Sequence, residues 1–252
     1  MPTENNLHDD HVQSILDSIR NGFAEKQLAS RELDIINTYV DIISNKKLPI
    51  SLLSGEITSV QALDRVGEYN KWFGRFKSYD KYFEINGDVI KRIINPDKNL
   101  KITFVDLNDE LGIVLHNMDN EDNEDNGDNY IFQLYIEKGV TSSITISDFR
   151  KLKEKFEDKK KGLKLLLNDD LTNKLGTPSE NTRTITIEYA THFSGIDLNE
   201  LETVYLFPAI DTEGKNYYKH KITFVMFFAY RGTTVGTVFY DTFQICPPDG
   251  CK

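Results

Sequence analysis

The sequence predicts an α+β protein, in which a helical amino-terminal region precedes a mostly antiparallel sheet backed by one amphipathic helix. Through residue 97, apolar residues recur at spacings of three and four, which is the period of a helix. From Lys101 onward, short β-branched and aromatic runs alternate with turn residues, which is the pattern of strands. We therefore expect a helical region at 1–97 and an α+β sheet domain at 98–252, with a further boundary near 138–146.

Four helices are predicted in the helical region, each from an apolar face of helical period. They span 15–23, 30–48, 58–83 and 87–94. The hydroxyl of Thr58 or Ser59 can cap the first turn of the third helix, because it accepts a hydrogen bond from an otherwise unpaired backbone N–H.

The sheet domain is predicted to contain a hairpin, further strands and one helix that begins at Ser147 and presents Phe149, Leu152, Phe156 and Leu163 on one face. The polar stretch 168–182 is expected to be a loop. Strand 219–230 has no polar alternation at its centre, so we expect it to be covered on both faces. The predicted strands are 101–105, 111–116, 130–137, 183–190, 203–207, 219–230 and 234–243.

Composition narrows the class of protein. The formal net charge of −10 disfavours nonspecific binding to nucleic acid or anionic lipid, although a local basic patch would override this. The longest apolar run, 222–230, is much shorter than the roughly 20 residues of a membrane-spanning helix. The amino terminus lacks the pattern of a secretory leader, and only two cysteines occur, so we expect a reducing, cytoplasmic location.

The acidic segment 117–129 is the most unusual in composition, with many carboxylates and amides and no basic residue. Oxygen ligands of this kind suit calcium. Aligning Gly127 with the glycine of an EF-hand loop makes Asp122, Glu124 and Asn126 candidate metal ligands, but position twelve is then Gln133, which has no carboxylate. We therefore favour a solvated hairpin loop and expect no bound cofactor.

An aromatic stretch with interspersed cations suggests a contact surface. Trp72, Phe76, Tyr79 and Phe83 are spaced to share one face of a helix, where they can bind a partner or a single nucleic acid strand, or anchor the helix at a membrane surface. The same spacing is typical of a core-facing stripe, and this is the interpretation we favour.

Segment 151–164 is the one clearly basic patch, with seven lysines and three acidic residues on a predicted amphipathic helix. It could bind nucleic acid or another acidic partner. Charge runs of this kind are more often solvated helix faces, so nucleic acid is the less favoured partner.

Histidines offer a second candidate site. His192 follows one predicted strand and His220 opens another, so they could meet Asp197 or Asp241 at one sheet edge. A histidine oriented by a carboxylate would provide a general base for a hydrolytic or metal-assisted reaction.

The chain ends with Tyr240-Asp241 and the segment Cys246-Pro-Pro-Asp-Gly-Cys251. This ending, over about the last hundred residues, resembles a group of uncharacterised bacterial proteins that close with a Tyr-Asp pair and a Cys-Pro-Pro tail. The resemblance implies no activity. The two thiols could form a small loop disulfide, and in a reducing compartment they are expected to be free.

No recognised reaction signature is present, since the sequence lacks a glycine-rich phosphate loop, a GxSxG elbow and a dinucleotide-binding fingerprint. The leading hypothesis is a non-catalytic interaction or assembly protein, with a protein partner or further copies of itself as its ligand. Sheet edges and the aromatic helix are the expected contact elements, because a partner can complete the unsatisfied surface of either.

Overall fold

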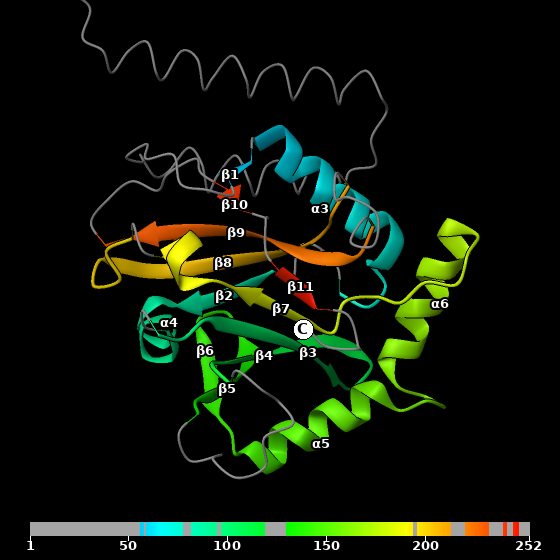
Figure 1. Cartoon of the computed structure of the whole chain (residues 1–252), viewed down its shortest axis with the longest axis horizontal. Coiled ribbons are helices and arrows are strands. Elements are labelled where there is room, and N and C mark those ends of the chain that lie inside the picture. Colours follow the sequence, from blue (N-terminus) through cyan, green and yellow to red (C-terminus); the bar gives the residue numbers. More distant parts are fainter. Residues whose placement is uncertain are drawn as a thin grey trace, which may run out of the picture.

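The computed structural model confirms the α+β class and shows two antiparallel sheets packed face to face, with helices on both outer sides (Figure 1). All strand pairs in both sheets are antiparallel. The structure describes residues 56–57, 59–77, 82–94, 97–118, 130–193, 196–212, 220–231, 239–240 and 244–246.

The first sheet has five strands in the order β1-β10-β9-β8-β2. Its centre is the long pair of β8 and β9, which runs in register from Ile210↔Ile222 to Thr203↔Ala229. Every residue of β9 except Tyr230 is buried, which confirms that this strand is covered on both faces. The strands are β1 (Glu56–Ile57), β2 (Phe83–Asn86), β8 (Leu201–Ile210), β9 (Ile222–Tyr230) and β10 (Phe239–Tyr240).

The second sheet has six strands in the order β11-β7-β3-β4-β5-β6. The predicted hairpin forms its centre, and the turn residues Asn108 and Asp109 both have positive φ, 57° and 68°. This is the backbone of the two-residue turn that fits the twist of paired strands. The strands are β3 (Leu100–Leu107), β4 (Glu110–His116), β5 (Phe132–Glu137), β6 (Val140–Ser143), β7 (Thr184–Ile187) and β11 (Gln244–Cys246).

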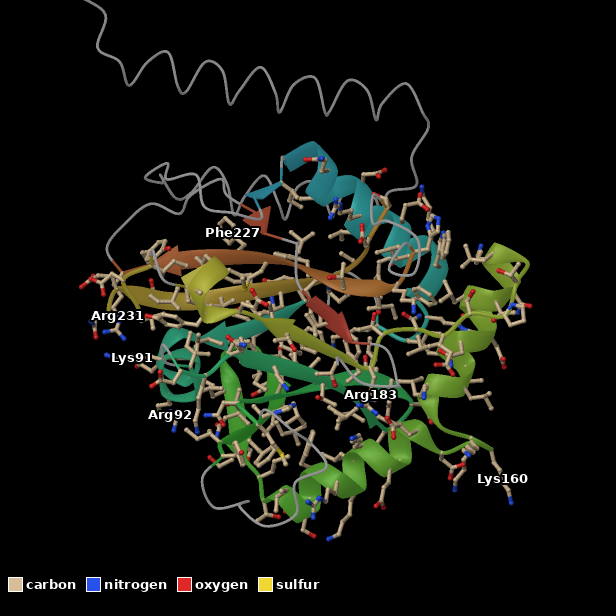
Figure 2. The ribbon with its side chains drawn as sticks, in the orientation of Figure 1. Lys91, Arg92, Lys160, Arg183, Phe227 and Arg231 are labelled. Atoms are coloured by element: carbon tan, nitrogen blue, oxygen red, sulfur yellow. The ribbon has the colours of Figure 1, made fainter. Side chains whose placement is uncertain are left out.

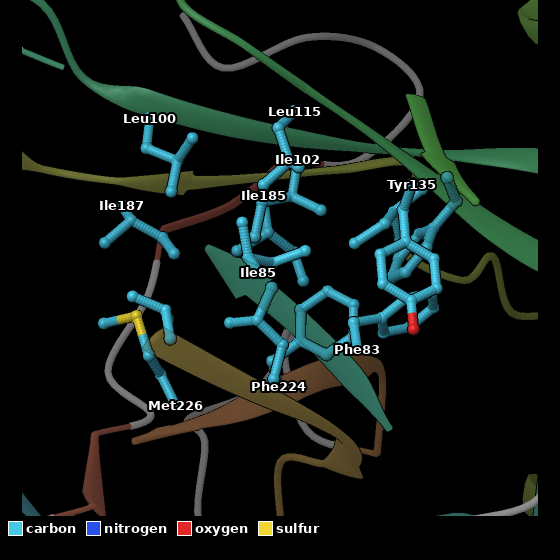
Figure 3. Close-up of a cluster of buried hydrophobic side chains, with 14 of the residues drawn as sticks. Phe83, Ile85, Leu100, Ile102, Leu115, Tyr135, Ile185, Ile187, Phe224 and Met226 are labelled. Atoms are coloured by element: carbon cyan, nitrogen blue, oxygen red, sulfur yellow. The ribbon is translucent and has the colours of Figure 1, made fainter. Parts of the chain in front are cut away.

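The main core lies between the two sheets (Figure 3). It forms because alternate side chains of each strand point to the same face. In β3, for example, Leu100, Ile102 and Phe104 are fully buried in this layer, while Val105 belongs to a separate cluster on the other face. The ring of Phe224 from β9 lies 5.5 Å from that of Phe104, centroid to centroid, and so joins the sheets.

Two smaller clusters lie on the outer faces. Helix α3 (Ser59–Phe73) covers the first sheet through Ala62 and Val66. Helix α5 (Ile146–Glu157) covers the second sheet through Phe149. The order of layers is therefore helix, sheet, sheet, helix (Figure 1).

The third predicted helix is correct at its start but wrong at its end. Helix α3 begins at Ser59 and stops at Phe73, whereas the prediction extended it to Phe83. A Cβ on Gly74 would lie 2.5 Å from the carbonyl oxygen of Asn70, and the chain turns there. Phe83 instead begins β2, which alternates buried and more exposed residues and pairs with β8.

The short helix α4 (Gly87–Ile93) confirms the fourth prediction. The Asn86 side chain caps it by accepting a hydrogen bond from the Asp88 N–H at 2.8 Å. A Cβ on Gly87 would lie 2.1 Å from the carbonyl oxygen of Leu201, so this glycine allows α4 to approach β8.

The helical part of the sheet domain differs from the prediction in two respects. The cap of α5 is Thr145 rather than Ser147, because its Oγ1 accepts the Asp148 N–H at 3.1 Å. The prediction of a loop at 168–182 is wrong over its first half, because a second helix, α6 (Leu163–Leu175), lies there. Leu163, expected on the face of the preceding helix, is the first residue of α6.

Two strand predictions also need correction, and one strand was missed. Strand 183–190 is shorter, because its end forms a π-helix, η2 (Tyr189–Phe193). Within the strand expected at 234–243 the structure describes β10, and β11 follows the predicted end and belongs to the other sheet. Strand β6 was not predicted at all.

The predicted regions 1–97 and 98–252 share one sheet. Strand β2 pairs with β8 and β1 pairs with β10, so strands from before residue 97 are bonded to strands from after it. The predicted helices at 15–23 and 30–48 lie outside the described residues. None of the helices in the described segments combines the length and apolar character needed to cross a bilayer.

Candidate functional site

The edge strand β6 is the best candidate for a functional surface. It ends the six-stranded sheet, and no other strand of the described residues pairs with its outer side. Its sequence, Val-Thr-Ser-Ser, contains no charged residue and no proline. Charges, prolines and bulges are the usual means by which proteins prevent an edge strand from pairing with another chain. The outer side of β6 has none of these.

The register shows which backbone groups of β6 face outward. The N–H of Ile144 donates to the carbonyl of Phe132 at 3.1 Å, so these two residues form a hydrogen-bonded pair. Bonded and non-bonded pairs alternate along an antiparallel ladder. Ser142 is therefore bonded to β5, whereas the N–H and C=O groups of Thr141 and Ser143 point away from it. These two residues provide the hydrogen-bonding groups of the open edge, of which the Ser143 carbonyl also accepts the Ser142 hydroxyl at 3.4 Å.

Exposed apolar side chains lie beside this edge. Ile136 is 55% exposed and Val140 is 44% exposed, the two largest values among the large hydrophobic residues that the structure describes. Ile136 lies where the β5–β6 register shifts, and Val140 begins β6. An apolar patch next to unpaired backbone groups is typical of a surface that another strand covers.

Side-chain hydrogen bonds hold β6 in place. The Thr141 hydroxyl donates to Gln133 Oε1 at 3.1 Å, and Gln133 Nε2 donates to the Ser143 hydroxyl at 2.6 Å. Gln133 is 3% exposed, so its amide is satisfied within the sheet. The strand is therefore preorganised, and its partner would not have to order it.

The turn between β5 and β6 is fixed to the other sheet. The Gly139 N–H donates to the Glu84 carbonyl at 2.8 Å, and Lys138 Nζ donates to the Tyr82 hydroxyl at 2.9 Å. That hydrogen bond is the main cause of the raised pKa of Lys138. The turn thus covers part of the β2 edge, while no strand of the described residues covers the outer edge of β6.

The predicted aromatic surface is mostly core. Phe76 and Phe83 are 5% and 0% exposed, and they lie in a turn and in β2 rather than on one helix. Trp72 stacks on His220 at a ring distance of 5.2 Å and donates to Glu68 at 3.1 Å. The prediction of one shared helical face is wrong, whereas the core interpretation is confirmed for Phe76 and Phe83. Tyr79 lies outside the described residues.

The structure does not bring the predicted histidine site together. His220 precedes β9, whereas Asp197 lies at the opposite end of that strand. Its place follows from the Glu200 N–H, which donates to the Asp197 carbonyl, and from the Glu200 carbonyl, which accepts the Arg231 N–H after β9. Nine residues of strand span roughly 26 Å. The π-helix η2, which includes His192, lies at the Asp197 end, because Phe193 packs against Phe228. Asp241 lies outside the described residues.

His220 has an unusual backbone conformation, with φ of 69°. Its N–H donates to the Asp211 carbonyl at 2.6 Å, and the Asp211 N–H donates to the Lys221 carbonyl at 3.2 Å. These bonds fix the approach to β9 beside the Trp72 ring. The neighbouring Lys221 is 5% exposed, and burial lowers its pKa.

The other metal and thiol predictions fall mostly outside the described residues. Asp122, Glu124 and Asn126 are not described, nor is Cys251. Cys246 pairs with Thr184 at the edge of the second sheet. Within the described part of the chain, no three His, Cys, Asp or Glu side chains are grouped in a way that would hold a metal ion.

Sequence reasoning missed a buried polar cluster beneath α5. The Met118 N–H donates to His116 Nδ1 at 3.3 Å, so Nε2 is protonated and donates to the Thr103 hydroxyl at 2.9 Å. Thr103 also bonds the Thr184 hydroxyl at 2.9 Å. The imidazole packs against the rings of Phe132 and Phe149. The sequence signal for this cluster was one polar residue in each of three neighbouring strands. The cluster keeps the buried His116 hydrogen-bonded within an apolar layer.

Comparison with models of protein families, with curated proteins and with solved structures gives no match for this chain. The resemblance of its ending to bacterial proteins with a Cys-Pro-Pro tail therefore stays a prediction. Function has to be inferred from the surfaces of the molecule itself.

Proposed function

We propose that this is a non-catalytic assembly protein that pairs with a second copy of itself through β6. The observation that supports this is the neutral, unprotected edge of β6 beside the exposed Ile136 and Val140. We further propose that it works in the cytoplasm, where its two cysteines would stay reduced.

A second copy is the partner that best fits the chemistry of β6. Most soluble oligomers are twofold symmetric, and across a twofold axis the strand pairs antiparallel with its own copy, so that residue i faces residue j and residue j faces residue i. Charged residues on such a strand would repel each other. The strand has only Val, Thr and Ser, so self-pairing meets no repulsion along the strand. Four residues supply few hydrogen bonds, so burial of Ile136 and Val140 must contribute to the affinity.

Thr141 offers a direct test, because its N–H faces the open edge. Thr141→Pro removes this donor without removing a bond to β5, which is the position at which an edge strand tolerates proline. Thr141→Val is the matched control, because both variants lose the hydroxyl bond to Gln133 but only proline loses the N–H. We expect a dimer for the wild type and for Thr141→Val, and a monomer for Thr141→Pro, in light scattering over a concentration series.

Val140→Lys tests the apolar part of the surface. A lysine at this exposed position costs little in the monomer, and it would place two like charges near the twofold axis. We expect a folded monomer whose unfolding temperature matches that of monomeric Thr141→Pro and does not depend on protein concentration. A wild type that stays monomeric at its highest soluble concentration would refute the proposal, and so would equal dimerisation of Thr141→Pro and Thr141→Val.

A further inference from the structure

The turn between α5 and α6 forms a projecting basic surface. Lys159, Lys160 and Lys161 follow one another in this turn, and all three are exposed. Lys160 lies at the outer margin of the molecule in Figure 2. Neither these residues nor Lys164 forms an ion pair with any residue that the structure describes.

Two exposed leucines lie directly after these lysines. Leu163, Leu167 and Leu171 bury one face of α6 in the core. The intervening Leu165 and Leu166 therefore point away from it, and they are 37% and 43% exposed. We call Lys159–Lys161 together with Leu165 and Leu166 the lysine tip. Apart from the pair beside β6, these are the large hydrophobic residues most exposed in the described part of the chain.

Two acidic residues beside the lysine tip are engaged in local bonds, while the exposed Asp169 lies one helical turn after Leu165. The Asp158 carboxylate accepts the backbone N–H groups of Lys160 at 2.8 Å and of Lys161 at 3.2 Å. Glu157 pairs with Arg183 at 3.4 Å. The net charge of −10 is that of the whole chain, and at physiological ionic strength the field of a distant charge decays over about 8 Å. Three exposed lysines therefore outnumber the one acidic residue, Asp158, of this turn.

We propose that the lysine tip binds the surface of an anionic lipid bilayer, with Leu165 and Leu166 entering the boundary between headgroups and acyl chains. Lysines give electrostatic attraction to anionic lipid, and adjacent apolar side chains supply the burial that holds a protein at the interface. Nucleic acid fits this surface less well, because it would leave both leucines in water. The surface meets the bilayer peripherally and does not cross it.

The lysine tip is independent of the assembly surface. Strand β6 leads into the start of α5, and the lysine tip follows its end, so about 18 Å of helix separates them (Figure 1). A monomeric variant such as Val140→Lys keeps the lysine tip unchanged. Failure of one proposal is therefore distinguishable from failure of the other.

Vesicle co-sedimentation of the full chain tests this inference. The vesicles contain phosphatidylcholine, with or without phosphatidylserine, and binding is measured at low and high salt. We expect binding only with phosphatidylserine, weakening as salt rises. Changing Lys159, Lys160 and Lys161 together to Gln should weaken binding about five-fold per lysine, or roughly a hundred-fold in all. Changing Leu165 and Leu166 together to Ser should weaken it about ten-fold.

A charge-matched control separates the local patch from net charge. Changing Lys91, Arg92 and Arg231 together to Gln removes three positive charges from the opposite side of the molecule (Figure 2). We expect this variant to bind vesicles like the wild type, and a loss equal to that of the lysine-tip variant would overturn the inference. Equal binding to uncharged vesicles, or no vesicle binding, would also overturn it. So would salt-dependent binding to a DNA oligonucleotide that the leucine changes leave unaltered, which would indicate a nucleic-acid surface.

Discussion

Two buried polar side chains hydrogen-bond the backbone at the start of β9. Asn181 Oδ1 accepts the N–H of Ile222 at 2.8 Å, and the Thr182 hydroxyl donates to the carbonyl of the same residue. Both residues are 1% exposed. They thereby pair the start of β9 on its side away from β8, where no strand lies beside it in the described part of the sheet. Tyr69 differs, because its fully buried hydroxyl has no hydrogen-bond partner.

Tyr69→Phe should therefore stabilise the protein. It removes a buried, unsatisfied hydroxyl and keeps the ring, which packs 5.9 Å from Phe73. The cost of such a group is about 1–3 kcal/mol, so we expect the free energy of unfolding at pH 7 to rise by about 1 kcal/mol. Urea unfolding measures this change. Lower stability of the variant at pH 7 would contradict the absence of a partner.

The same residue gives a pH dependence of known sign. Burial raises the pKa of Tyr69 above its ordinary value, and it raises the pKa of Tyr135, Tyr205 and Tyr230 to about 12. Above pH 10 the unfolded chain loses these protons before the folded protein does, so stability falls as pH rises. Tyr69→Phe removes one such group, and its stability should decline less steeply above pH 10.

Elements with strong local signals were predictable, and the others were not. The β3–β4 hairpin and the buried strand β9 follow from turn residues and an unbroken apolar run. Helix α6 was missed because Asn168, Asp169 and Asp170 resemble a loop, although Leu163, Leu167, Leu171 and Leu175 keep a spacing of four. Strand β6, the candidate site, has one apolar residue in four and gives no alternation to detect.

The two faces of α6 should respond differently to substitution. Leu167 is fully buried in the main core, whereas Leu166 beside it is 43% exposed. Leu167→Ala should lower the free energy of unfolding by about 2–5 kcal/mol, because it leaves a cavity. Leu166→Ala should change it by less than about 0.5 kcal/mol. Urea unfolding of both variants checks this, and equal effects would show that α6 is not packed as described.

At the scale of the whole molecule, each sheet draws strands from distant parts of the chain. Strands β10 and β11 follow each other closely but belong to different sheets. Strand β2 pairs with β8, more than a hundred residues later. Periodicity reports only local structure, so it predicted the elements without showing that the expected single sheet is two, or that a strand from before residue 97 joins one of them.

This pairing predicts that the boundary at residue 97 does not separate independent folding units. A fragment of residues 98–252 would lack α3 and β2, and with them Phe83 and Ile85, which are fully buried between the sheets (Figure 3). It would also expose Phe207 and Phe227, which α3 covers. The loss of two such buried side chains alone is worth several kcal/mol, comparable with the whole stability of a typical domain. We expect this fragment to show no cooperative thermal unfolding by circular dichroism, whereas a sharp transition would establish 98–252 as a domain that folds without the preceding region.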